Sequence, residues 1–242
     1  MSSKQHPTKA FVAAAGFGKR MRPLTATTPK PLIEVCGKSL IDHGLDALAL
    51  AGTKLAVVNV HYIADLLEAH VLRRSEPEII ISDERDELLE TGGGTVKGLP
   101  HLGDEAFFYL NADSIWIEGL RPNFTILADA WDDVKMDALL LLSPTVSAVG
   151  FSGTGDFTMD SEGHLARRRE NIVAPFAYAS AAIFHPRLFK NAPEGKFSLN
   201  VLFDQAIEAE RLFGVQMDGT WLHVGTPEAI DEAERAIRSA RS

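Results

Sequence analysis

The chain has 242 residues, of which 45% are hydrophobic and 24% are charged, and its formal net charge is −9. These values are typical of an ordinary globular domain, and the negative balance argues against non-specific nucleic-acid binding. The single cysteine, Cys36, excludes an intrachain disulfide. No apolar run approaches the roughly 20 residues of a membrane span, and the polar first seven residues lack the core of a secretion signal. We therefore expect a cytoplasmic protein without a membrane or nucleic-acid partner.

The acidic residues are distributed unevenly along the chain. All 33 lie at or after Glu34, whereas the first 33 positions carry six bases, namely Lys4, Lys9, Lys19, Arg20, Arg22 and Lys30. An acidic protein that keeps one segment free of carboxylates maintains a local positive field there. The distribution favours an anion-binding site near the N-terminus over chance in a short segment.

Hydrophobic patterning predicts strands and helices that alternate through the first 142 residues. Strands are expected at 10–15, 55–60, 78–82, 106–110 and 138–142, and helices at 39–51, 63–71, 124–131 and from position 92 onward. Near-continuous apolar strands that alternate with helices indicate a mostly parallel sheet covered on both faces. The sequence therefore predicts an α/β protein.

The pattern changes after residue 143. Hairpins are expected at 153–169, strands at 177–184 and 213–217, and helices at 198–208 and from Pro227, where Thr226 is a suitable N-cap. No internal repeat or low-complexity linker divides the chain. We therefore predict a single domain over residues 1–242.

The segment 16–31, GFGKRMRPLTATTPKP, follows the first predicted strand, at the sheet edge where open α/β sheets bind ligands. Gly16 and Gly18 allow backbone N–H groups to approach a phosphate, and three prolines stiffen the path to Lys30. Two better-known phosphate motifs do not fit, because Met21 stands where a dinucleotide fingerprint has its third glycine and Ala13 where a Walker A loop has its first.

The same segment resembles the signature of the sugar-1-phosphate nucleotidyltransferases, which is GxGxR, then P-L-T and a downstream P-K. The resemblance spans about 9–236 and is strongest up to Asp113. It implies a Rossmann-like, mostly parallel (mixed) central sheet with helices on both faces, of the nucleotide-diphospho-sugar transferase type. It also implies a nucleotide-binding part at about 9–142, followed at about 143–242 by a sugar-phosphate-binding part with the C-terminal helix.

The resemblance implies roles for individual residues. Arg20 and Lys30 match the catalytic cations, and the expected nucleotide-binding residues are Ala14, Gly16, Gly18, Lys19, Glu90, Thr91, Gly92 and Gly93. Leu110 to Asp113 resembles the family's N-x-D, whose aspartate binds Mg²⁺, so Mg²⁺ is the expected cofactor and Asp113 its ligand. In ETGGG (90–94), consecutive glycines suit a loop against which a nucleobase lies flat, although a hinge or a helix entry would also use them.

Two places depart from the family pattern. His223 stands where the family's W-x-D-x-G-T-P has a second metal-binding carboxylate, and imidazole suits Mn²⁺ or Zn²⁺ better than Mg²⁺. This residue could bind a metal, contact a phosphate or only pack. Arginines 167–169 stand near the family's phosphate-gripping lysine, a chemically reasonable exchange that a solvated surface would also explain. The expected sugar-phosphate residues are Asn111, Arg168, Arg169 and Ser180.

The segment Leu88 to Asp104 looks closest to the N-acetylmuramate-1-phosphate uridylyltransferases of peptidoglycan recycling. The implied partners are an NTP, with UTP favoured, and a sugar 1-phosphate, and the implied products are an NDP-sugar and pyrophosphate. We expect a monomer or small homo-oligomer. A mannose-1-phosphate guanylyltransferase or another hexose-1-phosphate nucleotidyltransferase is the alternative within this class. A catalytically weak regulatory protein that binds nucleotide or sugar is the alternative outside it.

Overall fold

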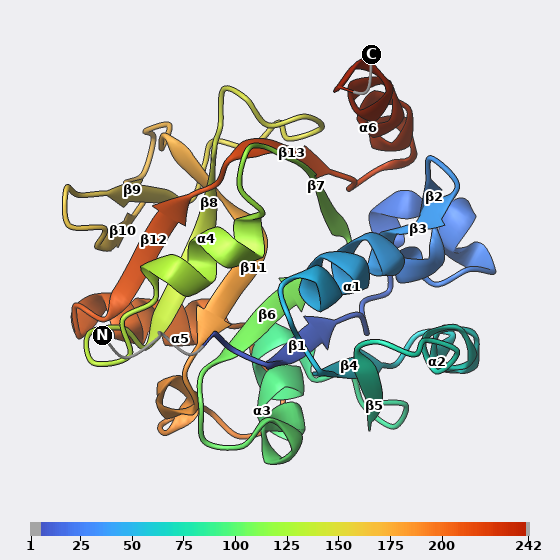
Figure 1. The fold of residues 1–242 in the computed structure, drawn as a ribbon, viewed down its shortest axis with the longest axis horizontal. Coiled ribbons are helices and arrows are strands. Elements are labelled where there is room, and N and C mark those ends of the chain that lie inside the picture. Colours follow the sequence, from blue (N-terminus) through green and yellow to red (C-terminus); the bar gives the residue numbers. More distant parts are fainter. Residues whose placement is uncertain (1–5, 241–242) are drawn as a thin grey trace.

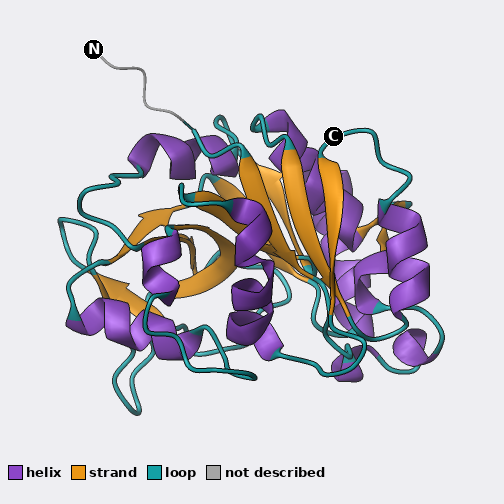
Figure 2. Cartoon of the chain, turned by 90° about the horizontal axis from the view of Figure 1, so that it is seen from below, coloured by secondary structure: helices purple, strands orange, loops and turns teal. Residues whose placement is uncertain are grey.

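A nine-stranded mixed sheet lies at the centre of the computed structural model, which describes residues 6–240, and helices cover both faces of this sheet (Figures 1 and 2). The strand order is β10-β9-β11-β6-β1-β4-β5, and β8 pairs with β11 and with β12. The strands are β1 (Lys9–Ala13), β4 (Leu55–Val60), β5 (Glu78–Asp83), β6 (Phe107–Asn111), β8 (Ala138–Pro144), β9 (Phe157–Met159), β10 (Leu165–Arg167), β11 (Phe176–Phe184) and β12 (Leu212–Gln216). The predicted α/β class with a mostly parallel, mixed sheet is confirmed.

The parallel part of the sheet comes from the first half of the chain. Strand β1 pairs in parallel with β4 and β6, and β4 pairs in parallel with β5. These strands therefore end at the same edge, where loops from distant parts of the sequence meet. Strand β11 runs antiparallel to both β6 and β8, and through these pairings the second half of the chain joins the same sheet.

Alternate residues of the strands belong to two hydrophobic cores on opposite faces. Ala10 and Val12 point into the core formed with α1 (Leu40–Leu50), α2 (Ala64–Val71) and α4 (Asn123–Ala130). Phe11 points into the other, with α3 (Glu90–Leu102) and α5 (Asn200–Glu208). Because both faces are covered, the strands have the continuous apolar character seen in the sequence.

A third, smaller core lies outside the main sheet and supports the glycine-containing loop. It joins buried residues of that loop to α6 (Pro227–Ala240) and to a separate antiparallel pair, β7 (Ser114–Glu118) with β13 (Gly219–His223). Its buried members are Met21, Ile33, Val35, Leu40, Ile115, Leu222, Val224 and Ala233. Figure 1 shows α6 beside β13 and the short hairpin of β2 (Glu34–Val35) and β3 (Lys38–Ser39). The C-terminal helix thus fixes a loop near the N-terminus.

The predicted elements include the strands of the main sheet but not the two separate strand pairs outside it. The predicted hairpin appears as β9 and β10, and the helix expected from position 92 begins at Glu90. The pairs β7–β13 and β2–β3 were not predicted. Strands β2 and β3 have two residues each, too few to carry a clear period, whereas β7 and β13 come from distant parts of the chain and no local pattern records their pairing. Between residues 6 and 240, no helix is both long and apolar enough to cross a membrane.

Candidate active site

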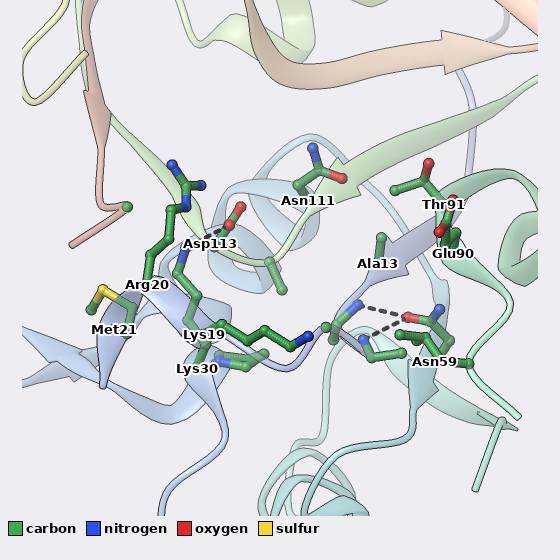
Figure 3. Close-up of a pocket in the computed structure, with 18 of the residues that line it drawn as sticks. Ala13, Lys19, Arg20, Met21, Lys30, Asn59, Glu90, Thr91, Asn111 and Asp113 are labelled. Atoms are coloured by element: carbon green, nitrogen blue, oxygen red, sulfur yellow. Dashed lines mark hydrogen bonds and ion pairs between the residues drawn. The ribbon is translucent and has the colours of Figure 1, made fainter. Parts of the chain in front are cut away.

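A cavity of about 520 Å³ opens at the carboxyl ends of β1, β4 and β6. Its lining comes from the glycine loop, the start of α3 and the segment after β6: Ala13, Ala14, Ala15, Gly16, Gly18, Lys19, Arg20, Met21, Lys30, Pro31, Asn59, Leu88, Glu90, Thr91, Asn111, Ala112, Asp113, Ser198 and Gly225. Figure 3 shows Lys30 and Asp113 at one end and Glu90 and Thr91 at the other. The cavity therefore has a cationic end and a neutral-to-acidic end.

The two glycines of the loop serve different purposes. Gly18 has a φ of +59°, and a β-carbon there would lie 2.9 Å from both Lys30 Cβ and Thr25 Cγ2. Gly16 has open space around its α-carbon, on the cavity side of the loop. Gly18 is thus required for the loop to fold over Lys30, while Gly16 leaves room for a ligand.

Lys30 and Asp113, 83 positions apart in the sequence, meet in the cavity. Lys30 Nζ lies 2.7 Å from Asp113 Oδ2, and the lysine is only 7% exposed. Lys30 opens a 3₁₀ turn after Pro29, which gives its backbone a defined direction. Desolvation acts to raise the pKa of Asp113, but the charge and hydrogen bond of Lys30 outweigh it and hold that pKa below its usual value. The Asp113 carboxyl is therefore ionised at neutral pH.

His223 does not line the cavity, but it lies close to Arg20 and Gly225, which do. A β-carbon on Gly225 would lie 2.8 Å from His223 Nε2 and 3.5 Å from Arg20 Nη1. Desolvation lowers the pKa of His223, the charge of Asp113 opposes this, and Lys30 reinforces it. The imidazole is therefore neutral at pH 7 and available as a ligand or a hydrogen-bonding group.

The residues around Asp113 fit a divalent cation held largely by its substrates. Within residues 6–240 there is no group of three or more His, Cys, Asp or Glu side chains that could bind a metal by themselves. The Asp113 side chain is 35% exposed, and only its Oδ2 is taken by Lys30. One carboxylate with phosphate oxygens and water is a common ligand set for Mg²⁺.

The glycines of ETGGG pack against the protein itself. A β-carbon would lie 2.3 Å from the Phe197 ring at Gly92, and 2.2 Å from the Gly195 carbonyl oxygen at Gly93. Neither glycine lines the cavity, whereas Glu90 and Thr91 do. All three glycines lie inside α3, and Gly92 and Gly93 allow the helix to approach the 195–197 segment closely, so the helix-entry alternative describes their position. A nucleotide contact of Gly92 and Gly93 stays a prediction.

The expected sugar-phosphate residues do not share one cavity. Asn111 lines the 520 Å³ cavity and accepts a hydrogen bond from the buried Tyr109 hydroxyl at 2.8 Å. Ser180 has a φ of +66° where the register of β11 shifts, next to Ala181, which pairs with Leu110. It therefore lies close to Asn111, although it does not line the cavity.

Arg168 and Arg169 line a separate cavity of about 300 Å³. The Arg168 guanidinium donates hydrogen bonds to the carbonyls of Arg169 and Ile172, each at 3.2 Å, so part of its hydrogen-bonding capacity stabilises its own loop. A sugar-phosphate role for these two arginines stays a prediction, and it would require the 168–174 segment to move toward Asn111.

Two buried polar residues at the cavity wall were not singled out from the sequence. Asn59 lines the cavity and is 2% exposed, and Glu84 behind it is fully buried. A signal existed, because Asn59 interrupts an apolar strand and Glu84 directly follows β5 at the ligand-binding edge of the sheet. The pattern of charged residues drew attention to the first loop instead.

Comparisons with known proteins bear on this site. The model of the family described as nucleotidyl transferase matches residues 9–152. N-acetylmuramate alpha-1-phosphate uridylyltransferase from Caulobacter vibrioides is 44% identical over 98% of this chain and 99% of its own length. The enzyme of that name from Neisseria meningitidis serogroup B is 30% identical over 93% and 96%.

Two further comparisons concern a relative that is longer than this chain and a solved structure that has low sequence identity to it. A mannose-1-phosphate guanylyltransferase catalytic subunit beta from Danio rerio is 38% identical, but this chain covers only 62% of its length. UDP-glucose pyrophosphorylase, solved with UDP-glucose, superposes with a TM-score of 0.76 at 18% identity, covering 97% of this chain and all of that one. The latter likeness shows the shared fold.

The mixed α/β sheet and a cationic cavity at its carboxyl edge define a nucleotide-binding α/β protein built to receive phosphates. With the family match over residues 9–152 and the two near full-length relatives, this chain belongs to the nucleotidyl transferase family.

Proposed function

We propose that this protein transfers the uridylyl group of UTP to N-acetylmuramate 1-phosphate, forming a UDP-sugar and releasing pyrophosphate. The observation that carries the proposal is the meeting of Lys30 and Asp113, 2.7 Å apart, at one end of a cavity large enough for a nucleotide. The choice of UTP and of this sugar rests on the Caulobacter and Neisseria relatives. The expected setting is peptidoglycan recycling in the cytoplasm.

In this reaction an oxygen of the sugar phosphate attacks the α-phosphorus of UTP. The bond from that phosphorus to the α,β-bridging oxygen breaks, and pyrophosphate leaves with the bond's electron pair. The nucleophile is already ionised at pH 7, so no general base is required. Repulsion between two polyanions is the main obstacle, and positioning together with charge neutralisation is the catalysis that the cavity offers.

Several cavity residues have a proposed part in neutralising or positioning the substrates. Backbone N–H groups at Gly16 and Gly18, with Lys19 and Arg20, hold the β- and γ-phosphates. Lys30 contacts the α-phosphate as its charge develops. Asp113 would hold the Mg²⁺, which when bound supplies Lewis-acid neutralisation of the phosphates. Glu90 and Thr91 contact the nucleoside, and Asn111 faces the sugar phosphate.

A panel of substrates tests this proposal. The purified protein is incubated with UTP, dTTP, GTP, CTP or ATP and with N-acetylmuramate, N-acetylglucosamine, glucose or mannose 1-phosphate, and pyrophosphate release is measured. We expect UTP with N-acetylmuramate 1-phosphate to give the highest kcat/KM, by about tenfold or more, since leaving one buried polar group without its partner costs about 1–3 kcal/mol. Faster turnover of GTP with mannose 1-phosphate would replace the proposal by its alternative within the family. Nucleotide binding without pyrophosphate release on any sugar phosphate would support a regulator.

His223 provides a prediction about the metal. Replacing this neutral imidazole with aspartate places a second carboxylate near Asp113. Two carboxylates supply more hard oxygen ligands than one, and such ligands suit Mg²⁺ and Mn²⁺. We expect His223→Asp to bind Mn²⁺ about tenfold more tightly than the parent when nucleotide is absent, measured by electron paramagnetic resonance of free Mn²⁺. His223→Asn, which adds no charge, is the matched control. Equal Mn²⁺ affinity in all three proteins would show that position 223 does not contribute to the metal site.

A further inference from the structure

We propose that Asn59 and Glu84 are positioning residues, and that they form a buried bridge which sets the distance between the phosphate-binding and base-binding walls of the cavity. The bridge runs from the backbone that follows β1, through the two side chains, to the backbone that precedes α3. Neither side chain has a part in the mechanism described above.

Asn59 makes the first half of the bridge. Its Oδ1 accepts hydrogen bonds from the N–H groups of Ala14 at 2.6 Å and Ala15 at 3.2 Å (Figure 3). Both alanines line the cavity directly before Gly16. The amide therefore anchors the start of the phosphate loop by giving two backbone N–H groups a hydrogen-bond acceptor.

Glu84 makes the second half. Its Oε1 accepts a hydrogen bond from Asn59 Nδ2 at 2.7 Å, and its Oε2 accepts one from the Leu89 N–H at 3.0 Å. Leu89 is the N-cap residue of α3 and directly precedes Glu90, which lines the base end. The fully buried Glu84 carboxylate thus connects the Asn59 amide to the backbone of Leu89 at the start of α3.

Helix α3 and His61 pack against the two side chains and restrict their geometry. A β-carbon on Gly94 would lie 2.6 Å from Glu84 Oε1 and 2.7 Å from Asn59 Nδ2, so α3 packs directly onto the two side chains. In addition, His61 Nδ1 lies 2.7 Å from the Glu84 carbonyl oxygen. A buried network in which every acceptor has a donor rigidifies its site, whereas one mismatched partner in such a network is costly.

The donor and acceptor pattern of the bridge is directional, and this allows a sharp test. In Glu84→Gln, the new amide turns a donor toward either Asn59 Nδ2 or the Leu89 N–H, each of which is itself a donor. In Asn59→Asp, the new carboxylate lies next to the Glu84 carboxylate in a buried environment, and the two like charges repel each other.

Combining the two substitutions exchanges the amide and the carboxylate between the two positions. In the double variant, the carboxylate now at position 59 accepts from the N–H groups of Ala14 and Ala15 and from the amide now at position 84. The oxygen of that amide accepts from the Leu89 N–H. Every hydrogen bond and the total charge are then restored.

The experiment measures UTP affinity by calorimetry, without sugar phosphate, together with the thermal midpoint of unfolding. We expect each single variant to bind UTP about tenfold or more weakly than the parent, because displaced walls misplace both ends of the nucleotide. The double variant should bind within about threefold of the parent, since its hydrogen bonds and its total charge match those of the parent.

Asn123→Asp separates positioning from plain stability. Asn123 is also buried and donates its amide to the Glu118 carboxylate at 2.5 Å, and neither residue lines the cavity. This control should lower the thermal midpoint without changing UTP affinity. Single variants that keep parental UTP affinity, or a double variant that stays as weak as they are, would overturn the inference.

The inference rests on the proposed function for the choice of UTP and for the names of the two walls. If the parent protein fails to bind UTP, the uridylyl assignment is wrong, and the bridge is then measured with the triphosphate that the parent turns over in the substrate panel.

Discussion

Replacing Lys30 with methionine should lower kcat by about 10²–10³-fold, the usual loss when one preorganised charge-stabilising group is removed. Methionine keeps most of the apolar stem, so the packing of Lys30 against Gly18 is retained and the fold should survive. The ammonium group is held within 2.7 Å of Asp113 in a largely buried position, where its charge acts more strongly than in bulk water. Steady-state rates of pyrophosphate release measure the effect.

A surface ion pair provides the matched control for Lys30→Met. Lys38 Nζ lies 2.7 Å from Asp46 Oδ2, the same distance, but both side chains are 45% exposed and neither residue lines the cavity. Lys38→Met should leave kcat within about twofold of the parent, since exposed pairs contribute little. Near-parental turnover in Lys30→Met would remove this lysine from the catalytic machinery.

Asp113→Asn should be nearly as damaging, with kcat reduced by about 100-fold or more. The amide is a weaker ligand for Mg²⁺ and leaves the Lys30 ammonium without its counter-charge. We expect the Mg²⁺ concentration for half-maximal UTP binding to rise as well, which a calorimetric titration at several Mg²⁺ concentrations measures. Asp46→Asn is the control, and an unchanged Mg²⁺ dependence in Asp113→Asn would exclude this carboxylate from the metal site.

The same residue contributes to the pH dependence of stability. Lys30 keeps the pKa of Asp113 below its ordinary value, so the folded state binds fewer protons here than the unfolded state. The contribution is therefore present above the ordinary carboxyl range and is lost as pH falls through the folded-state pKa. Thermal midpoints of the parent and of Asp113→Asn should converge as the pH is lowered into that region.

Sequence reasoning worked well where local patterns carry the information. The apolar strands and the loop of 16–31 were recognisable because strand burial and glycine–proline chemistry are properties of short segments. Lys30 and Asp113 were both selected before any distance was known, since one follows a stiffened loop and the other ends an apolar strand.

The glycines of ETGGG show where such reasoning is incomplete. The prediction that something lies flat against them was reasonable, and what lies there in the structure is the Phe197 ring and the Gly195 carbonyl. A glycine run signals close approach without naming the group that approaches, because that group comes from a distant part of the chain. Arg168 and Arg169 illustrate the same point, since proximity in sequence to β11 did not bring them to the cavity that holds Asn111.

The class of this protein, the strands of its sheet and the chemistry of its first loop could be predicted from the amino-acid sequence, because each of these depends on neighbouring residues. Three contacts depend on the folded arrangement of the chain: Lys30 meets Asp113, His223 lies close to Arg20, and Asn59 and Glu84 connect two walls of one cavity. These contacts join residues that are 25 to 203 positions apart. They are set by how the strands align in the sheet, which the packing of both hydrophobic cores fixes and no local pattern records.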